Sequence, residues 1–511
     1  MIFRVLIAVT IGLCLTTGEA ADSPLAKGVV FHDQNGNGQR DEGERGIAKV
    51  RVSNQRDVTL TDGEGRWELP VTDDTILFVI KPSGWRTPTN EFRLPQFHYI
   101  HKPKGSPKLR FLGVNPTGPL PESVDFPLQP QAEPDTFKAI FFGDPQPRTQ
   151  DQIDFIAHDV IEELVGTDAR FGVTLGDILF DDLSLFDSMN ATVALVGVPW
   201  FNVIGNHDIN TEAKKDYLSD ETFERIYGPT YYSFDYGKVH FIVLDNVMWA
   251  ERGRKYVGEL GEQQLAFVGN DLKHVPEQQL VVLMMHIPLP AMTDRQGLYR
   301  LIEQRPYTLS LSGHTHTQEH HFISEKDGWR GKQPHHHIVN VTVSGSWWKG
   351  AKDELGIPHT MMRDGAPNGW STITFDGHDA TFDFRAARRP ADHQMNIHAP
   401  EQVAATNAHQ AVIHVNVFSG SERSTVDMSV AGSKWIPLKR TSRVDPYYAA
   451  VRARDMKDFP SAPALNAPVL STHLWMGNLP TGLRPGTHLI RVKTRDLYGR
   501  TFTGRRVLRV K

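Results

Sequence analysis

The chain has 511 residues, and a length of this order suggests about three or four domains. Hydrophobic residues make up 39% of the sequence and charged residues 23%, which predicts packed cores and argues against extensive disorder. The formal net charge of −5 argues against a chain-wide nucleic-acid-binding surface, because phosphate backbones are bound by clustered Lys and Arg.

Residues 1–20 have the pattern of a secretory signal peptide. Arg4 supplies a positive charge, residues 5–15 are almost entirely apolar, and small residues around Ala20 offer a cleavage site. The apolar run is short for a membrane span, so we expect a secreted or periplasmic protein with no stable membrane insertion after cleavage; an uncleaved anchor is the alternative. The single cysteine of the sequence, Cys14, lies in this segment, and disulfides are therefore not expected in the mature chain.

Residues 25–130 have the composition of a small β-sandwich domain. Apolar positions alternate between many Gly and Pro residues, and in residues 61–69 an Asp-Gly turn leads into a predicted strand. A proline-rich stretch, residues 116–134, is expected to be the linker to the next domain.

A candidate calcium loop lies near the start of this domain. Oxygen-bearing side chains occur at positions 1, 3, 5, 9 and 12 of a twelve-residue pattern with Gly38 at position 6. These residues are Asp33, Asn35, Asn37, Asp41 and Glu44. The flanking residues look like strands rather than EF-hand helices, and the segment resembles the calcium-binding β repeats of bacterial surface proteins. A plain Asn-Gly turn is the alternative.

Residues 135–390 change to a rhythm of apolar strands and amphipathic helices. The predicted strands lie at residues 139–142, 171–175, 201–204, 240–244, 280–285 and 307–311, with a helix over residues 153–164. This alternation predicts an α/β fold built in layers. Ligands in such folds bind at the carboxyl ends of the strands.

Five of these strands are followed by clusters of Gly, Asp, Asn or His, which include the residue types that commonly bind metal ions. The clusters are Asp144-Pro145-Gln146, Gly176-Asp177, Gly205-Asn206-His207-Asp208, His286 and Gly313-His314-Thr315-His316. Carboxylates, imidazoles and amides without any thiolate suit first-row ions such as Mn, Zn or Fe. Two such ions would outweigh the charge of Asp144 and Asp177 and attract an anionic phosphate.

In order and spacing, these clusters resemble the five motif blocks of the calcineurin-like metallophosphoesterases over about residues 137–385. The resemblance implies a layered β-sandwich with flanking helices, between two smaller all-β domains. It also implies a centre of two divalent ions that hydrolyses phosphate mono- or diesters with a water nucleophile. Position by position, the first ion would be bound by Asp144, Gln146, Asp177 and His316. The second would share Asp177 and add Asn206, His286 and His314.

The resemblance gives His207 the role of acid or charge stabiliser at the leaving oxygen, with Asp208 orienting its ring. Two positions depart from the common pattern. Gln146 replaces the more frequent His, although one branch of the family carries the same Gly-Asp-x-Gln form. Phe180 stands where purple acid phosphatases have a ligating Tyr, which excludes a ferric–tyrosinate centre.

Three segments after the last ligand are candidates for the substrate side of the pocket: residues 335–337 (three His), 347–348 (two Trp) and 364–370. The alternative is that the tryptophans pack the sandwich and the histidines lie in an exposed loop. Residues 395–511 alternate again and predict a C-terminal β-sandwich without helical periodicity.

The sequence thus predicts a secreted phosphoesterase acting on a phosphorylated small molecule, lipid, glycan or protein. A nucleotidase is the second enzymatic hypothesis, although Asp208 stands where nucleotidases usually have Glu. A surface binding module with a vestigial metal site is the non-enzymatic hypothesis.

Overall fold

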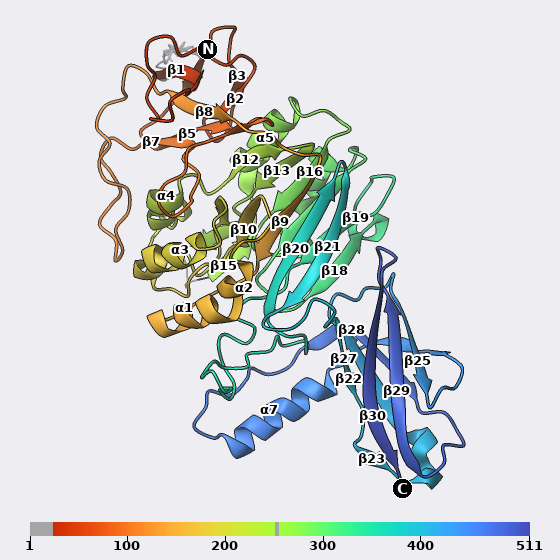
Figure 1. Ribbon diagram of the computed structural model, residues 1–511. Helices are drawn as coiled ribbons and strands as arrows, with labels where there is room; N and C mark the ends of the chain where they lie inside the picture. The colour runs from red at the N-terminus through yellow and green to blue at the C-terminus, as the bar shows by residue number, and fades with distance from the viewer. Residues whose placement is uncertain (1–23, 251–254) are drawn as a thin grey trace, which may run out of the picture.

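The computed structural model describes residues 24–250 and 255–511, so the predicted signal peptide and Cys14 lie outside the described residues. The N-terminal, middle and C-terminal domains follow one another along the molecule (Figure 1). Within the described residues, no helix combines the length and the apolar character that crossing a bilayer requires.

The N-terminal domain consists of two four-stranded sheets. One has the order β4 (Arg66–Pro70), β1 (Leu25–His32), β8 (Phe126–Pro130) and β6 (Trp85–Arg86), and the other β3 (Val58–Leu60), β2 (Arg51–Ser53), β5 (Thr75–Ile80) and β7 (His98–His101). The predicted linker is wrong in one respect, because its residues include β8, which pairs in parallel with β1. Prolines at both ends of this short strand hid it in the sequence.

The middle domain is built on two larger sheets that face each other. The five-stranded sheet has the order β11 (Trp200–Val203), β10 (Phe171–Leu175), β9 (Thr136–Phe142), β20 (Gly369–Asp376) and β21 (Asp379–Ala386). The six-stranded sheet has the order β12 (Tyr232–Tyr236), β13 (Val239–Val243), β16 (Leu280–Met284), β17 (Thr308–Ser312), β19 (His335–Val339) and β18 (Glu319–Ile323). A separate hairpin joins β14 (Val247–Ala250) to β15 (Lys255–Gly258).

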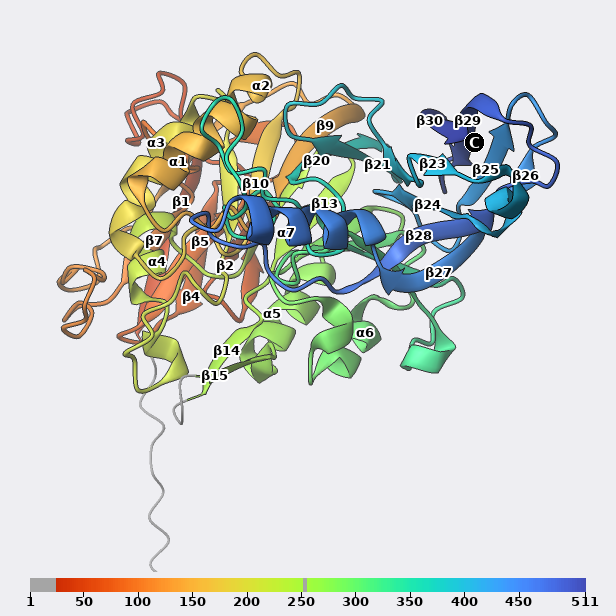
Figure 2. The ribbon, with the colours of Figure 1, turned by 90° about the horizontal axis from the view of Figure 1, so that it is seen from below.

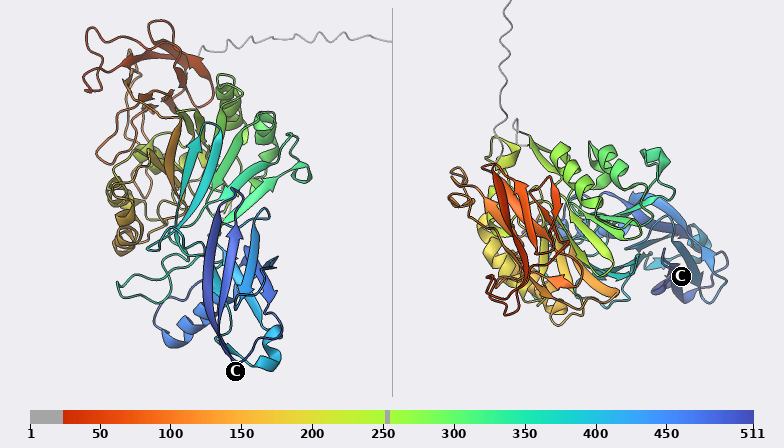
Figure 3. Two further views of the ribbon diagram at one scale, coloured as in Figure 1. Left: turned by 45° about the vertical axis from the view of Figure 1, so that its right-hand side comes forward. Right: turned by 90° about the horizontal axis from the view of Figure 1, so that it is seen from above.

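The side chains of β9 show how the layers are held together. Phe137, Ala139 and Phe141 point into the core between the two sheets, whereas Ile140 and Phe142 contact the core under the helices. This alternation follows from the two-residue period of a strand. Helices cover both outer faces (Figure 3), as predicted for the layered fold. They are α1 (Gln150–Ile156), α2 (Glu162–Leu164) and α3 (Phe186–Ala194) on one side and α5 (Gly261–Leu272) and α6 (Arg295–Ile302) on the other, with α4 (Glu221–Tyr227) near the N-terminal domain.

Each of the six apolar runs predicted in this domain is a strand, within about one to three residues at each end. The predicted helix is continuous from α1 to α2 through a π-helical turn over Ala157–Ile161. The strands β9, β10 and β11 run parallel, as do β13, β16 and β17, so their carboxyl ends open on the same side of the fold.

The C-terminal domain is a second pair of sheets with one helix added. The sheets have the orders β22 (Met395–His398), β24 (Val412–Val417), β28 (Leu470–Asn478), β27 (Lys439–Val444), and β23 (Gln402–Val403), β30 (Thr501–Val510), β29 (Gly486–Arg495), β25 (Thr425–Val430), β26 (Ile436–Pro437). The prediction of no helical segment here is wrong, because α7 (Pro446–Asp458) lies between β27 and β28. Asp445 caps it by accepting from the Tyr447 N–H. Seen from below, α7 lies in front of the middle domain (Figure 2).

Candidate metal centre

The predicted metal ligands lie in the turns that directly follow β9, β10, β11, β16 and β17. Five of them have a positive φ: Asp144 (43°), Gln146 (42°), Asp177 (51°), His314 (77°) and His316 (57°). Each such residue costs of order 1–3 kcal/mol, and strain of this kind concentrates at functional sites. The turns therefore hold these side chains in orientations that an unstrained backbone would not give.

Two motif glycines allow the turns to approach one another. A Cβ on Gly205 would lie 2.0 Å from the Asp177 backbone nitrogen, and one on Gly313 would lie 2.5 Å from Asp144 Oδ2. Any side chain at either position would push a predicted ligand away, so these two blocks require glycine for close packing.

The residues predicted for the second metal ion come together. One ligand atom from each of Asp177, His286 and His314 lies within 4.8 Å of the others. His286 Nε2 lies 3.3 Å from Asp177 Oδ1, 3.0 Å from Asn206 Oδ1 and 3.2 Å from His314 Nδ1. The side chains of Asp177, Asn206 and His314 thus all lie within 3.3 Å of His286 Nε2.

The residues predicted for the first metal ion lie in contact pairwise. Gln146 Nε2 donates to Asp177 Oδ2 (2.5 Å), and His316 Nε2 lies 3.8 Å from Asp144 Oδ1. The Gln146 Oε1 oxygen is buried and has no hydrogen-bond partner. Since a buried polar atom normally has a partner, this oxygen is available to a cation. The donor set of oxygens and imidazoles fits divalent ions.

Two imidazoles are oriented by backbone carbonyls. His286 Nδ1 donates to Leu175 O (2.9 Å), and His316 Nδ1 donates to Gly345 O (2.6 Å). Each ring therefore directs Nε2 toward the carboxylates, as is usual for metal-binding histidines. Burial lowers the pKa of His316 to about 3 and that of His314 to about 4, so both rings are neutral and can act as ligands.

The carboxylates of this group and His286 shift one another's pKa values. Burial alone would raise the pKa of Asp177, but the nearby His286 holds it below its ordinary value. Despite burial, Asp177 and Asp144 raise the pKa of His286 to about 9. Burial raises the pKa of Asp144 to about 7, because the ionised carboxylate is poorly solvated there. A bound cation would stabilise the ionised form.

His207 lies beside this group, and its ring is held by Asp181 and Phe180. His207 Nδ1 bonds to Asp181 Oδ1 at 2.7 Å, and the Phe180 ring stacks on the imidazole with centroids 3.9 Å apart. Burial opposes charge on His207, but the hydrogen bond to Asp181 raises its pKa above the ordinary value. Its side chain is 24% exposed, so Nε2 can reach a substrate.

The prediction that Asp208 orients the His207 ring is wrong. Asp208 is fully buried and accepts hydrogen bonds from the backbone N–H groups of Ile178, Leu179 and Gly205. It therefore ties the turn after β10 to the turn after β11, a structural role. Asp181 was missed, although an acid four residues after Asp177 in the same turn was a usable signal.

The segments predicted to line the pocket lie in different places. Residues 335–337 form the start of β19, where His335 and His337 are buried and bond to Ser310 on β17. They lie neither in the pocket nor in an exposed loop. Trp347 does lie at the centre, with its ring stacked 3.8 Å from that of His316.

Other residues near the centre were not all predicted. Trp348 is buried and donates its ring N–H to Pro145 O, and Asp364 accepts from the Gln318 N–H. Tyr256, which the sequence did not single out, lies edge-on to His314 at 5.8 Å.

The candidate calcium loop joins β1 to the segment before β2, with strands on both sides as predicted. Asp33 Oδ1 and Oδ2 accept from the N–H groups of Gly36 and Gly38, and Asp41 Oδ2 accepts from the amides of Asn35 and Asn37. Glu44 accepts from the Gln34 and Asp41 N–H groups. All five predicted oxygen-bearing side chains thus belong to one hydrogen-bonded loop.

Comparisons with known proteins bear on the whole chain. A family model described as calcineurin-like phosphoesterase matches residues 137–318, and models for the N-terminal and C-terminal parts of such proteins match residues 34–113 and 337–502. No curated protein matches. Among solved structures, purple acid phosphatase PPD1 from yellow lupin (Lupinus luteus) seeds is similar, with 14% sequence identity and a TM-score of 0.36, covering 67% of this chain and 69% of that chain. The three family models follow one another in the expected order, and the chain belongs to the calcineurin-like phosphoesterases, hydrolases of phosphoester bonds.

Proposed function

We propose that the protein is a secreted phosphoesterase that uses two divalent ions, of Mn, Zn or Fe, to hydrolyse phosphate mono- or diesters with water. The observation that carries the proposal is the convergence of Asp177, His286 and His314 within 4.8 Å beside a buried Gln146 oxygen that has no partner. Asp144, Gln146, Asp177 and His316 would hold one ion and Asp177, Asn206, His286 and His314 the other. Ions in such a site supply a water nucleophile at neutral pH and neutralise charge on the phosphoryl oxygens.

The chain's own residues contribute proton transfer. His207 donates its Nδ1–H to Asp181, which leaves Nε2–H of the imidazolium free to protonate the departing alcohol oxygen. The raised pKa of His207, with Asp181 as the cause that overcomes burial, keeps that proton available near neutral pH. Stacking on Phe180 prevents the ring from turning away. Secretion is supported by the signal-like pattern of residues 1–20.

The test is His207→Ala in the protein loaded with Mn or Zn. We expect kcat on 4-nitrophenyl phosphate or its bis-ester to fall by about 10²–10⁴-fold while metal content stays unchanged, because a proton donor is lost and no ligand is removed. His274→Ala, an exposed histidine beyond α5, is the control and should keep full activity. Loss of metal would make His207 a ligand, and full activity would remove it from the mechanism.

We also propose that the loop from Asp33 to Glu44 binds calcium and stabilises the N-terminal domain. Three carboxylates and two amides lie in one loop, and the bound ion would offset their mutual repulsion. At a calcium concentration a hundredfold above Kd, binding increases the free energy of unfolding of the domain by about 2.7 kcal/mol. Added calcium should raise the unfolding midpoint of the wild type and of Glu42→Gln, an adjacent exposed control, but not of Glu44→Gln. An equal response of all three proteins would reduce the loop to a turn.

A further inference from the structure

Two aromatic rings that stack on site histidines also carry cationic groups. Arg148 Cζ lies 3.1 Å from the centroid of the Phe180 ring, whose other neighbour is His207 at 3.9 Å. Both groups are too close to share one face of the ring, so Arg148 and His207 lie on opposite faces. The Phe180 ring therefore separates Arg148 from His207.

The second ring is Trp347, which stacks on His316. Lys349 Nζ lies 6.0 Å from its ring and Arg363 Cζ lies 5.9 Å from it. The backbone N–H of Arg363 donates to the backbone carbonyl of His316, which holds this arginine next to a predicted ligand. Trp348, which precedes Lys349, donates its ring N–H to Pro145 O, three residues before Arg148, so the chain segments that carry these cationic groups are in contact.

No carboxylate of the described residues lies within ion-pair distance of these three side chains. Within the part of the chain that the structure describes, none of Arg148, Lys349 and Arg363 forms an ion pair. Lys349 donates to Asn466 Oδ1 and Arg363 to Ala467 O, both neutral acceptors of the C-terminal domain. Asp181 is the carboxylate that interacts electrostatically with Arg148, and it is already hydrogen-bonded to His207.

All three side chains remain partly or fully exposed, so a ligand can reach them. Arg388 of the same domain, by contrast, is paired with Asp159 and Asp353. Arginine and lysine side chains that are held by neutral acceptors and aromatic faces, without a carboxylate partner of their own, are stabilised when they bind an anion.

We propose that Arg148, Lys349 and Arg363 form an anion subsite beside the metal centre, which binds a second anionic group on the alcohol part of the substrate. The substrate class is then a phosphomonoester whose alcohol carries a carboxylate or another phosphate. The position of Arg148 beyond the ring that faces His207 supports the alcohol side, because His207 acts on the leaving oxygen. This inference rests on the proposed function.

The test measures binding of ligands that cannot be hydrolysed. Calorimetry on the metal-loaded protein compares phenylphosphonate with 3- and 4-phosphonobenzoate, which add one carboxylate at two spacings. We expect at least one phosphonobenzoate to bind about 10-fold or more tightly than phenylphosphonate, the size of a charge-assisted hydrogen bond. Arg148→Gln and Arg363→Gln should each reduce that ratio several-fold.

Arg423→Gln is the matched control. Its guanidinium Cζ also lies over an aromatic ring, 3.6 Å from the centroid of Phe322. Phe322 belongs to β18, at the edge of the six-stranded sheet. It should leave the ratio unchanged. Equal binding of all three ligands, or a ratio that Arg148→Gln and Arg363→Gln do not alter, overturns the subsite. Hydrolysis of phenyl phosphate is scored separately: a clear binding ratio without any turnover would retain the subsite and contradict the proposed function.

Discussion

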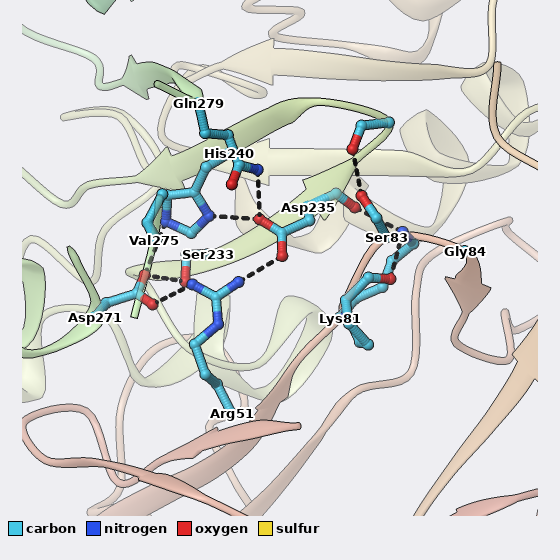
Figure 4. A network of polar contacts seen from close by, with 12 residues as sticks. Arg51, Lys81, Ser83, Gly84, Ser233, Asp235, His240, Asp271, Val275 and Gln279 are labelled. Atoms are coloured by element: carbon cyan, nitrogen blue, oxygen red, sulfur yellow. Dashed lines mark hydrogen bonds and ion pairs between the residues drawn. The ribbon is translucent and has the colours of Figure 1, made fainter. Parts of the chain in front are cut away.

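The two outer domains are attached to the middle domain in different ways. The N-terminal domain is joined by buried charges: Arg51 Nη1 lies 2.7 Å from Asp271 Oδ1, and its Nη2 lies 2.5 Å from Asp235 Oδ2. His240 bridges the same two carboxylates at 2.8 and 2.9 Å (Figure 4). His240 lies at the amino end of β13, whereas the predicted ligands follow the carboxyl ends of the parallel strands.

The C-terminal domain instead contacts the segment that leads into the metal centre. Tyr448 OH bonds to Ser346 Oγ (2.9 Å), and Asp455 accepts from the Ala351 N–H (3.0 Å). The carbonyl of Gly345, the residue before Ser346, is the acceptor that orients His316. The N-terminal attachment should therefore govern stability, and the C-terminal attachment should govern the metal centre.

Arg51→Met should cause the largest change, and in stability alone. It removes the arginine partner of two buried carboxylates and leaves them with His240 alone, and breaking a buried pair on one side costs about 3–5 kcal/mol. Urea unfolding gives the free energy, and kcat/KM of the folded protein should stay within about twofold of wild type.

Lys238→Gln provides the control for Arg51→Met. Lys238 and Asp135 form an ion pair in which both side chains are exposed, 62% and 61%, so its loss should cost less than about 1 kcal/mol. A loss of activity in Arg51→Met without a loss of stability would contradict the division between the two attachments.

The metal centre could be predicted because its signals are local. Each ligand cluster directly follows an apolar strand, and parallel strands bring such clusters to one edge. The partner of His207 could not be chosen in this way. Asp181 and Asp208 are both close to it in sequence, and only the fold shows that Asp208 turns toward backbone N–H groups.

The strand of histidines was missed because a run of three identical polar residues has no alternation. Its pairing becomes clear only beside β17, where Ser310 and Ser312, two residues apart, supply hydroxyl groups to His335 and His337. The helix α7 was missed for another reason. Asp445 and Pro446 form an ordinary helix start, but the strands around them dominated the pattern.

Asp364→Asn should have an intermediate effect, and on metal affinity. Asp364 Oδ2 accepts from the Gln318 N–H (2.7 Å), two residues after His316, and lies 3.0 Å from His473 Nε2 of the C-terminal domain. An amide cannot accept from both donors at that oxygen without turning its NH₂ group toward other donors. Loss of such outer contacts typically weakens metal binding by 10–100-fold, and we expect about 10-fold in a manganese titration.

Asp427→Asn is the control for this titration. It removes an ion pair with Lys493 that lies wholly within the C-terminal domain, so metal affinity should not change. Equal affinities for wild type and Asp364→Asn would show that the C-terminal domain does not influence the centre.

The smallest expected effect is a pH dependence of stability at the N-terminal attachment. Burial alone would lower the pKa of His240, but Asp271 and Asp235 raise it above 6.5, so its stabilisation is complete below pH 6.5 and is lost as pH rises through the folded pKa. Burial would raise the pKa of Asp271, but His240 and Arg51 hold it below 3.8, so that contribution is lost only in acid. Above pH 6.5, one proton gives a slope of at most about 1.4 kcal/mol per pH unit. His240→Gln should therefore flatten the decline in unfolding free energy between pH 6 and pH 9, and parallel curves for the two proteins would mean that His240 is not charged in the folded state.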